Sequence, residues 1–217
     1  MSVPSNARFS PVDPRVTVYL KDLAGPDDVL LGRMEAHCAE VGFPLIGRES
    51  GRWLELLTRS IGGRRVFELG SGFGYSAFFF ARAVGEGGEV IGSEKDAHEL
   101  ARHEQFFAGH VLAPRIDLRQ GWAEDVLAAT EGSFDVIFMD IDKMGYPSAL
   151  EAAIPRLRVG GLLLADNALW GGQVVLDDRD ATTASLHRFN QMIHRDPRLQ
   201  ASILPAGDGL AVALRVA

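Results

Sequence analysis

The chain has 217 residues, of which 47% are hydrophobic and 24% charged, a composition that suits one large globular domain. Its formal net charge of −7 argues against a protein that coats nucleic acid or an anionic membrane. The one cysteine, Cys38, cannot form an intrachain disulfide, and no apolar run reaches the roughly 18 to 20 residues that a membrane span needs. We therefore expect a cytoplasmic location and no membrane partner.

The N-terminal part of the sequence predicts a short arm followed by helices. Residues 1–14 are polar and contain three prolines, which predicts a flexible arm and lacks the apolar segment of a signal peptide. Two helices are expected next, the second beginning at Asp27 or Asp28 and ending near Val41, and a third over 48–61. With no linker or repeat in the sequence, we expect a single domain over 1–217, made of the arm (1–14), N-terminal helices (15–62) and a core (63–217).

Beyond Arg64 short apolar runs alternate with helix-length segments, which predicts βαβ units and a parallel sheet. The last two runs are joined only by residues 205–209, too few for a crossover helix, so they predict an antiparallel hairpin. The predicted fold class is therefore α/β, with a mostly parallel seven-stranded sheet, a C-terminal hairpin and helices on both faces. The expected strands are 65–69, 89–93, 116–119, 134–139, 161–165, 199–204 and 210–216.

A glycine-rich loop follows the first expected strand. Residues 67–76 read FELGSGFGYS, and Tyr75 stands where a dinucleotide-binding loop has its third glycine. Glu68 would repel a pyrophosphate, but its charge suits a ligand that carries an ammonium and a sulfonium. Glu94, at the end of the second strand, is placed to accept hydrogen bonds from both hydroxyls of a ribose. The alternatives are a purely structural glycine turn among surface acids and a nicotinamide site.

Polar residues also end the fourth and fifth expected strands. Asp140 follows the fourth strand, and Asp166 and Asn167 follow the fifth. Because ligands bind beyond the carboxyl ends of parallel strands, these three side chains are expected to lie together, with Lys143 nearby. Two carboxylates and an amide oxygen suit Mg²⁺, Mn²⁺ or Ca²⁺ and leave positions open for a substrate. The alternative is that these acids are ordinary surface residues.

Three segments together resemble the cation-dependent O-methyltransferases, among them catechol O-methyltransferase and the plant caffeoyl-CoA O-methyltransferases. They are the glycine loop, DIDKMGY at 140–146 and DNALW at 166–170, within a similarity that runs from about Pro44 to the C-terminus. The resemblance implies a Rossmann-like S-adenosylmethionine-dependent methyltransferase fold, a homodimer and a small hydroxylated aromatic substrate with vicinal oxygens. Caffeoyl-CoA enzymes have a substrate-binding asparagine where this chain has Gly171, so the plant substrate class is not implied.

The same resemblance implies roles for individual residues. Asp140, Asp166 and Asn167 would hold the divalent cation, and Lys143 and Asp140 would be the catalytic residues, with Lys143 as the base. Trp122 would lie at the edge of the adenine, although a core position is the alternative. The expected S-adenosylmethionine-binding residues are Ile46, Glu68, Gly70, Ser71, Gly72, Gly74, Ser76, Glu94, Gly121, Trp122, Ala123, Asp140 and Asp142.

The chemistry follows from the acidity of the acceptor. A phenol with an unperturbed pKa of about 10 is a poor nucleophile at neutral pH, and a cation that chelates two adjacent oxygens favours the oxyanion. Two other functions remain open. One is methylation of a hydroxylated uridine in tRNA, docked on a basic rim of Arg8, Arg15, Arg48 and Arg52. The other is a non-catalytic S-adenosylmethionine-binding module, against which the presence of both Lys143 and the acidic set argues.

Overall fold

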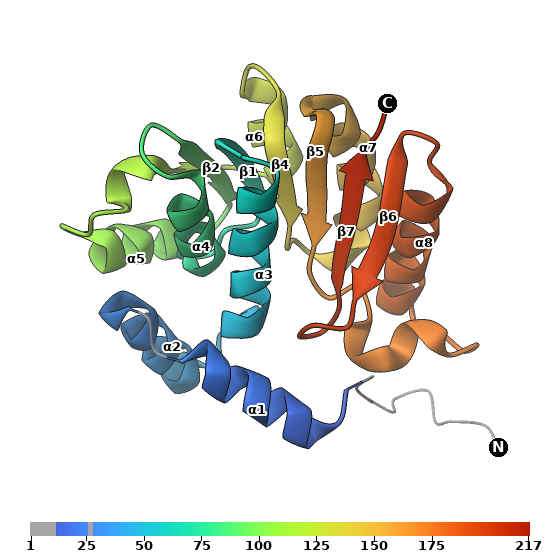
Figure 1. The fold of residues 1–217 in the computed structure, drawn as a ribbon, viewed down its shortest axis with the longest axis horizontal. Coiled ribbons are helices and arrows are strands. Elements are labelled where there is room, and N and C mark those ends of the chain that lie inside the picture. Colours follow the sequence, from blue (N-terminus) through green and yellow to red (C-terminus); the bar gives the residue numbers. More distant parts are fainter. Residues whose placement is uncertain (1–11, 26–27) are drawn as a thin grey trace.

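Two of the three N-terminal helices lie beyond one end of the sheet, and the third packs on one of its faces (Figure 1). The computed structural model describes residues 12–25 and 28–217, so most of the expected arm and the alternative cap Asp27 lie outside the described residues. Asp28 begins the second helix as expected, because its carboxylate accepts a hydrogen bond from the Leu30 amide at 2.8 Å. The three helices are α1 (Pro14–Ala24), α2 (Val29–Val41) and α3 (Gly47–Ser60).

Seven strands form one sheet in the order β3-β2-β1-β4-β5-β7-β6. All neighbouring pairs are parallel except β5–β7 and β6–β7, which confirms the expected hairpin. Strand β5 begins at Leu157, four residues earlier than predicted. Its register with β4 shifts between Phe134 and Val136, so Leu157 pairs with Phe134 ahead of Gly160 and Gly161, which interrupt the apolar run. The strands are β1 (Arg65–Leu69), β2 (Glu89–Glu94), β3 (Ile116–Gln120), β4 (Phe134–Met139), β5 (Leu157–Ala165), β6 (Leu199–Leu204) and β7 (Leu210–Arg215).

Helices cover both faces of the sheet (Figure 1). Successive strand residues point to opposite faces, so Val66 packs with α3, α4 and α5, whereas Phe67 packs with α6, α7 and α8. No helix in the described part of the chain combines the length and apolar character of a membrane span. The remaining helices are α4 (Tyr75–Val84), α5 (Ala97–Phe107), α6 (Ala123–Ala129), α7 (Tyr146–Ala153) and α8 (Ala181–Arg195), with short 3₁₀ turns η1 (Ala113–Arg115), η2 (Lys143–Gly145), η3 (Ile154–Arg156) and η4 (Trp170–Val175).

The carboxyl ends of the parallel strands meet at the edge of the sheet that faces α1 and α2 (Figure 1). Strand β1 lies between β2 and β4. From β1 the chain adds β2 and β3 on one side and then β4 and β5 on the other, so the strand order reverses direction at β1. The turn between β6 and β7 reaches the same edge, where the Ala168 amide donates to the Gly209 carbonyl at 2.8 Å. Crevices at such a reversal are where open α/β sheets bind ligands, so the site is expected here.

Candidate functional site

The glycine loop connects β1 to α4 in a conformation that requires glycine. Gly70, Gly72 and Gly74 have φ angles of 82°, 52° and 93°. A β-carbon at Gly70 would lie 2.5 Å from the backbone oxygen of Asp140, and one at Gly74 would lie 2.6 Å from the ring of His103. The loop therefore packs directly against the end of β4, and it leaves its backbone accessible to a ligand.

Glu68 lies behind this loop and organises it. Its carboxylate is fully buried and accepts hydrogen bonds from the hydroxyls of Ser71, at 2.5 Å, and Ser76. Burial raises the pKa of Glu68 to about 7, although the two hydroxyl hydrogen bonds oppose the shift. The carboxylate therefore contacts the loop, as the sequence predicts, and does so through side-chain hydroxyls.

Two adjoining cavities of about 260 and 270 Å³ lie at the carboxyl edge of the sheet. They share Gly70, Glu94, Asp140 and Ile141, which form the boundary between them. All of the expected cofactor residues line one or both cavities except Glu68 and Gly74, which lie behind the loop. Sequence reasoning did not identify nine further lining residues, six of which are sequence neighbours of predicted cofactor residues. The nine are Phe43, Pro44, Leu45, Tyr75, Ser93, Lys95, Glu124, Ile141 and Gly145.

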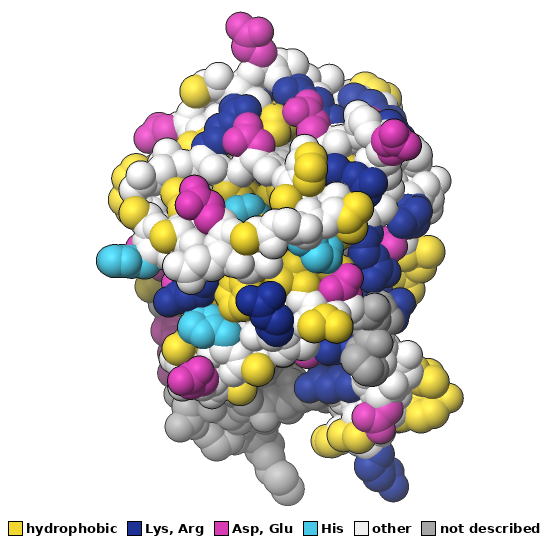
Figure 2. Space-filling view, turned by 90° about the vertical axis from the view of Figure 1, so that its left-hand side faces the viewer, with side chains coloured by type: hydrophobic (Ala, Val, Ile, Leu, Met, Phe, Trp, Pro, Cys, Tyr) yellow, Lys and Arg dark blue, Asp and Glu magenta, His cyan; other side chains and the backbone are white. Residues whose placement is uncertain are grey.

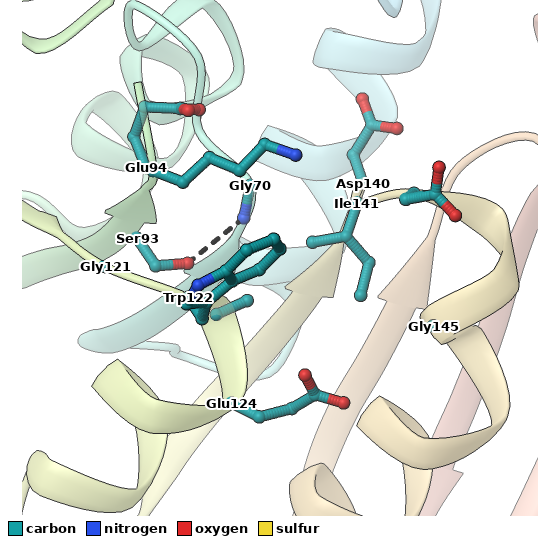
Figure 3. Close-up of a pocket in the computed structure, with 12 residues that line it drawn as sticks. Gly70, Ser93, Glu94, Gly121, Trp122, Glu124, Asp140, Ile141 and Gly145 are labelled. Carbon is teal, nitrogen blue, oxygen red and sulfur yellow. Dashed lines mark hydrogen bonds between the residues drawn. The ribbon is translucent and has the colours of Figure 1, made fainter. Parts of the chain in front are cut away.

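Glu94 ties the end of β2 to the glycine loop. One carboxylate oxygen accepts a hydrogen bond from the Gly72 amide at 2.9 Å, and the other accepts one from the Asp96 amide at 2.8 Å. Figure 3 shows the carboxylate at the rim of the first cavity, above Ser93, whose hydroxyl accepts a hydrogen bond from the Gly70 amide at 3.2 Å. Each Glu94 oxygen retains a lone pair for a further donor from the cavity.

Trp122 forms one wall of the first cavity. Its side chain is 66% exposed, so the alternative core position is wrong. The ring projects from the start of α6 toward Ile141 (Figure 3), and the Lys95 ammonium lies 5.0 Å from the ring centroid. This contact is within the range of a cation–π interaction and holds the indole at the mouth of the cavity.

Asp140, Lys143 and Tyr146 form a connected polar group at the end of β4. The Lys143 ammonium donates to Asp140 at 2.6 Å and to the Tyr146 hydroxyl at 3.2 Å. The buried Tyr146 hydroxyl in turn lies 3.2 Å from the Met139 carbonyl and 3.0 Å from the Asp166 carbonyl. Tyr146 thus connects the ends of β4 and β5. The sequence signal for this role is its position three residues after Lys143, a spacing at which two side chains can meet on one helical turn.

Asp166 has the side chain that most clearly fits a cation ligand. Its side chain is buried, and Oδ1 has no hydrogen-bond partner among the described residues. Burial, reinforced by the charge of Asp140, raises the pKa of Asp166 well above the usual range. A buried carboxylate oxygen without a donor is costly unless a cation neutralises it, so the donor set fits a hard divalent ion.

The neighbouring residue, Asn167, has an unusual backbone. Its φ angle is 57°, in the left-handed region, and its side-chain amide donates to Asp208 at 3.3 Å. Within residues 12–25 and 28–217, no three His, Cys, Asp or Glu side chains form a metal site by themselves. Asn167 directly follows Asp166 at the end of β5, and its part as a third, amide ligand beside Asp140 and Asp166 stays a prediction. The contribution of Asp208, in the turn between β6 and β7, was not predicted.

Comparison with known proteins places the chain in a family. A family model described as O-methyltransferase matches residues 31–216. The catechol O-methyltransferase of Niastella koreensis is 32% identical over 209 residues, which cover 90% of this chain and 94% of that protein. Caffeoyl-CoA O-methyltransferase 1 of Zea mays is 34% identical over 184 residues, which cover 77% of this chain and 70% of that protein.

Solved structures agree with this assignment. The O-methyltransferase of Bacillus cereus in complex with SAH superposes with a TM-score of 0.82 at 28% identity, covering 93% of this chain and 97% of that chain. The Streptomyces achromogenes O-methyltransferase involved in tomaymycin synthesis, in complex with SAM, gives a TM-score of 0.84 at 26% identity, covering 94% and 96%. The chain therefore belongs to the O-methyltransferase family and is an S-adenosylmethionine-dependent methyltransferase.

Proposed function

We propose that this methyltransferase requires a divalent cation and methylates a hydroxyl group of a small aromatic with vicinal oxygens, such as a catechol. The observation that carries the proposal is the buried, unpartnered Oδ1 of Asp166, which lies where the ends of β4 and β5 meet. The name of the Niastella koreensis relative, a catechol O-methyltransferase, supports the choice of acceptor.

In this proposal Asp140, Asp166 and Asn167 hold the cation, with Mg²⁺ as the first candidate and Mn²⁺ or Ca²⁺ as others. The cation would supply a positive charge that orients two adjacent acceptor oxygens and favours the ionised form of one. Asp140 also lines both cavities, so the cation-binding set adjoins the space assigned to the methyl donor. That adjacency is what a direct methyl transfer needs, because most of its rate comes from positioning.

We assign the two cavities to S-adenosylmethionine, whose sulfonium supplies the methyl group. Glu94 would accept hydrogen bonds from the ribose hydroxyls with its remaining lone pairs, and Trp122 would border the adenine. Glu68 would act through Ser71 and Ser76, which it holds at the cavity wall. The remaining cofactor residues of the proposal line the cavities or, in the case of Gly74, shape the loop.

We propose that Lys143 either accepts the proton of the acceptor hydroxyl or stabilises the oxyanion that remains. Its ammonium is held at the edge of the second cavity by Asp140 and by the Tyr146 hydroxyl. In its neutral form the amine can accept the hydroxyl proton, and in its charged form it can stabilise the oxyanion. Both roles need the Nζ atom fixed, and the two hydrogen bonds fix it.

The two alternative functions receive less support. Arg15 pairs with Asp13, Arg48 pairs with Glu35 at 2.6 Å and Arg52 donates to the Ala24 carbonyl at 2.8 Å, so these members of the expected basic rim have internal partners. Arg8 lies outside the described residues. On the face shown in Figure 2, basic side chains are interspersed with acidic ones. A protein that only bound S-adenosylmethionine would not need the hydrogen-bonded group of Asp140, Lys143 and Tyr146, so this group argues against a non-catalytic module.

We also propose a homodimer that buries an apolar groove between α1 and α3. The groove has a volume of about 590 Å³. Leu23 and Leu56 both line it and are 64% and 57% exposed, so the groove presents apolar side chains at the surface. The N-terminal helices and the core are proposed to form one domain. The buried free thiol of Cys38 suits the proposed cytoplasmic location.

The proposed function is tested by transfer of a labelled methyl group from S-adenosylmethionine. Catechol, a monohydroxylated phenol and bulk tRNA are offered to the protein with Mg²⁺ and after treatment with EDTA. The expected result is transfer to catechol that EDTA abolishes and added Mg²⁺ restores. Equal transfer with and without EDTA would overturn the cation dependence, and transfer to tRNA alone would overturn the acceptor class.

A further inference from the structure

The turn between β6 and β7 is bonded closely to the segment that follows β5. Two backbone amides of that segment donate to carbonyls of the turn: Leu169 to Asp208 at 3.0 Å and Ala168 to Gly209 at 2.8 Å. A β-carbon at Gly209 would lie 2.5 Å from the Leu169 side chain, so the two segments are in direct contact. The turn therefore packs directly against the segment that contains Asn167.

Asp208 also uses its side chain on this segment. Its Oδ1 accepts a hydrogen bond from the Gly171 amide, and its Oδ2 lies 3.3 Å from Nδ2 of Asn167. One carboxylate thus bonds both ends of the segment that contains Asn167. Both oxygens are engaged with this segment, so Asp208 bonds directly to the stretch of chain that contains the proposed ligand Asn167.

The segment needs such support because its backbone is strained. Asn167 and Trp170 both have φ in the left-handed region, at 57° and 50°, which non-glycine residues rarely adopt. Residues in this region persist only where their surroundings hold them. The Asn190 side chain adds a further hydrogen bond, to the Ala168 carbonyl at 2.7 Å. The hairpin turn and α8 together hold the conformation that presents Asn167.

The chemistry of Asp208 decides which end of the Asn167 amide faces the cation. A side-chain amide has one donor end and one acceptor end, and either could in principle point into the site. An ionised carboxylate only accepts hydrogen bonds, so Asp208 selects the amino end of Asn167. The carbonyl end, Oδ1, is then left for a cation, which requires an oxygen.

We propose that Asp208 is a positioning residue that orients Oδ1 of Asn167 toward the divalent cation. This role rests on the proposed cation site. It predicts that Asp208 acts through Asn167, whereas a carboxylate that merely attracted the cation through space would act regardless of the residue at position 167. The two possibilities are separable, because the first disappears when the Asn167 side chain is removed.

The test compares the affinity for Mn²⁺ of four proteins: wild type, Asp208→Asn, Asn167→Ala and the double variant. Free Mn²⁺ is measured by electron paramagnetic resonance. Asparagine at 208 keeps an oxygen for the Gly171 amide but presents its own amino group to Asn167, which favours the opposite orientation of the Asn167 amide. We expect Asp208→Asn to weaken Mn²⁺ binding about tenfold in the wild-type background and by less than about twofold in the Asn167→Ala background.

Two controls complete the experiment. Asp178→Asn removes one exposed carboxylate of the η4–α8 connection and should leave the Mn²⁺ affinity unchanged. Binding of S-adenosylhomocysteine, measured by calorimetry, should be the same in wild type and Asp208→Asn, which shows that the variant is folded. Equal weakening in both backgrounds, or no weakening in either, would overturn the positioning role alone. Wild-type protein that binds no Mn²⁺ would overturn the proposed cation site and this role with it.

Discussion

Lys143 and Asp140 form a short ion pair at the end of β4, with Nζ 2.6 Å from Oδ1 and the lysine side chain only 12% exposed. The same carboxylate is a proposed ligand of the cation. A divalent cation held by Asp140 would compete with the ammonium for that carboxylate. The ion pair therefore places Lys143 Nζ directly beside the proposed cation site.

Replacing Lys143 with alanine should reduce kcat for catechol by about 10²- to 10⁴-fold, the usual cost of removing a general base. Mn²⁺ and S-adenosylmethionine binding should persist. Raising the pH should partly restore turnover, because hydroxide can then ionise the acceptor. The matched variant Lys143→Arg keeps the charge but cannot act as a base, so wild-type turnover in that variant would show that Lys143 is only an electrostatic stabiliser. The measurement is kcat against pH for all three proteins.

Asp166→Asn should weaken cation binding and reduce turnover while S-adenosylmethionine affinity stays nearly unchanged, since Glu68 and Glu94 belong to β1 and β2 and are not proposed ligands of the cation. The wild-type affinity for Mn²⁺ should also rise with pH. Burial and Asp140 raise the pKa of Asp166, so the carboxyl is protonated at low pH and must release its proton to bind the cation. Calorimetry in two buffers of different ionisation enthalpy measures this release, and a pH-independent affinity in wild type would contradict the assignment.

The apolar runs and the polar residues at their ends were enough to predict the sheet and the place of the site. Runs such as Phe134–Met139 are buried on both faces and apolar except for Asp135, and the first polar residue after each run lies at the edge of the sheet. That is why Asp140, Asp166 and Asn167 could be predicted from the sequence to lie at this edge.

Other features depend on contacts between segments far apart in the sequence. Asp208 lies 41 residues beyond Asn167, and no spacing rule connects them. The pairing of Arg48 with Glu35 likewise depends on how α2 packs against α3, and it removes an arginine that the sequence alone placed on a basic rim. Trp122 is an aromatic residue of the kind that usually lies in a core, and only the tertiary structure shows it exposed at the cavity mouth.

The proposed homodimer predicts that Leu56→Asp yields a monomer. An aspartate at position 56 would place an unpaired charge in the buried apolar interface. The free-energy cost of burying that charge would exceed the stabilisation that Leu56 contributes to the dimer. Light scattering should give the dimer mass for wild type and the monomer mass for the variant. Val159→Asp, at a residue that is equally exposed (57%) but lies near the amino end of β5, is the control and should remain dimeric. A monomer mass for wild type over a wide concentration range would contradict the proposal.

Glu68 predicts how the stability of the cofactor-free protein depends on pH. Burial raises the pKa of Glu68 from 4.5 to about 7, so the folded state holds a proton that the unfolded state has already released over that interval. The contribution of Glu68 to the free energy of unfolding is therefore fully present below pH 4.5 and is lost as the pH rises through about 7.

Glu68→Gln does not titrate and keeps an acceptor for one of the two serine hydroxyls. Its melting temperature relative to wild type should consequently increase between pH 5 and pH 8, whereas S-adenosylmethionine should bind the variant more weakly, because the loop serines lose one of their acceptors. Glu86→Gln, at an exposed glutamate that precedes β2, serves as the control for the general loss of a carboxylate. A difference in melting temperature between Glu68→Gln and wild type that stays constant from pH 5 to pH 8 would show that Glu68 is ionised in the folded protein throughout this range.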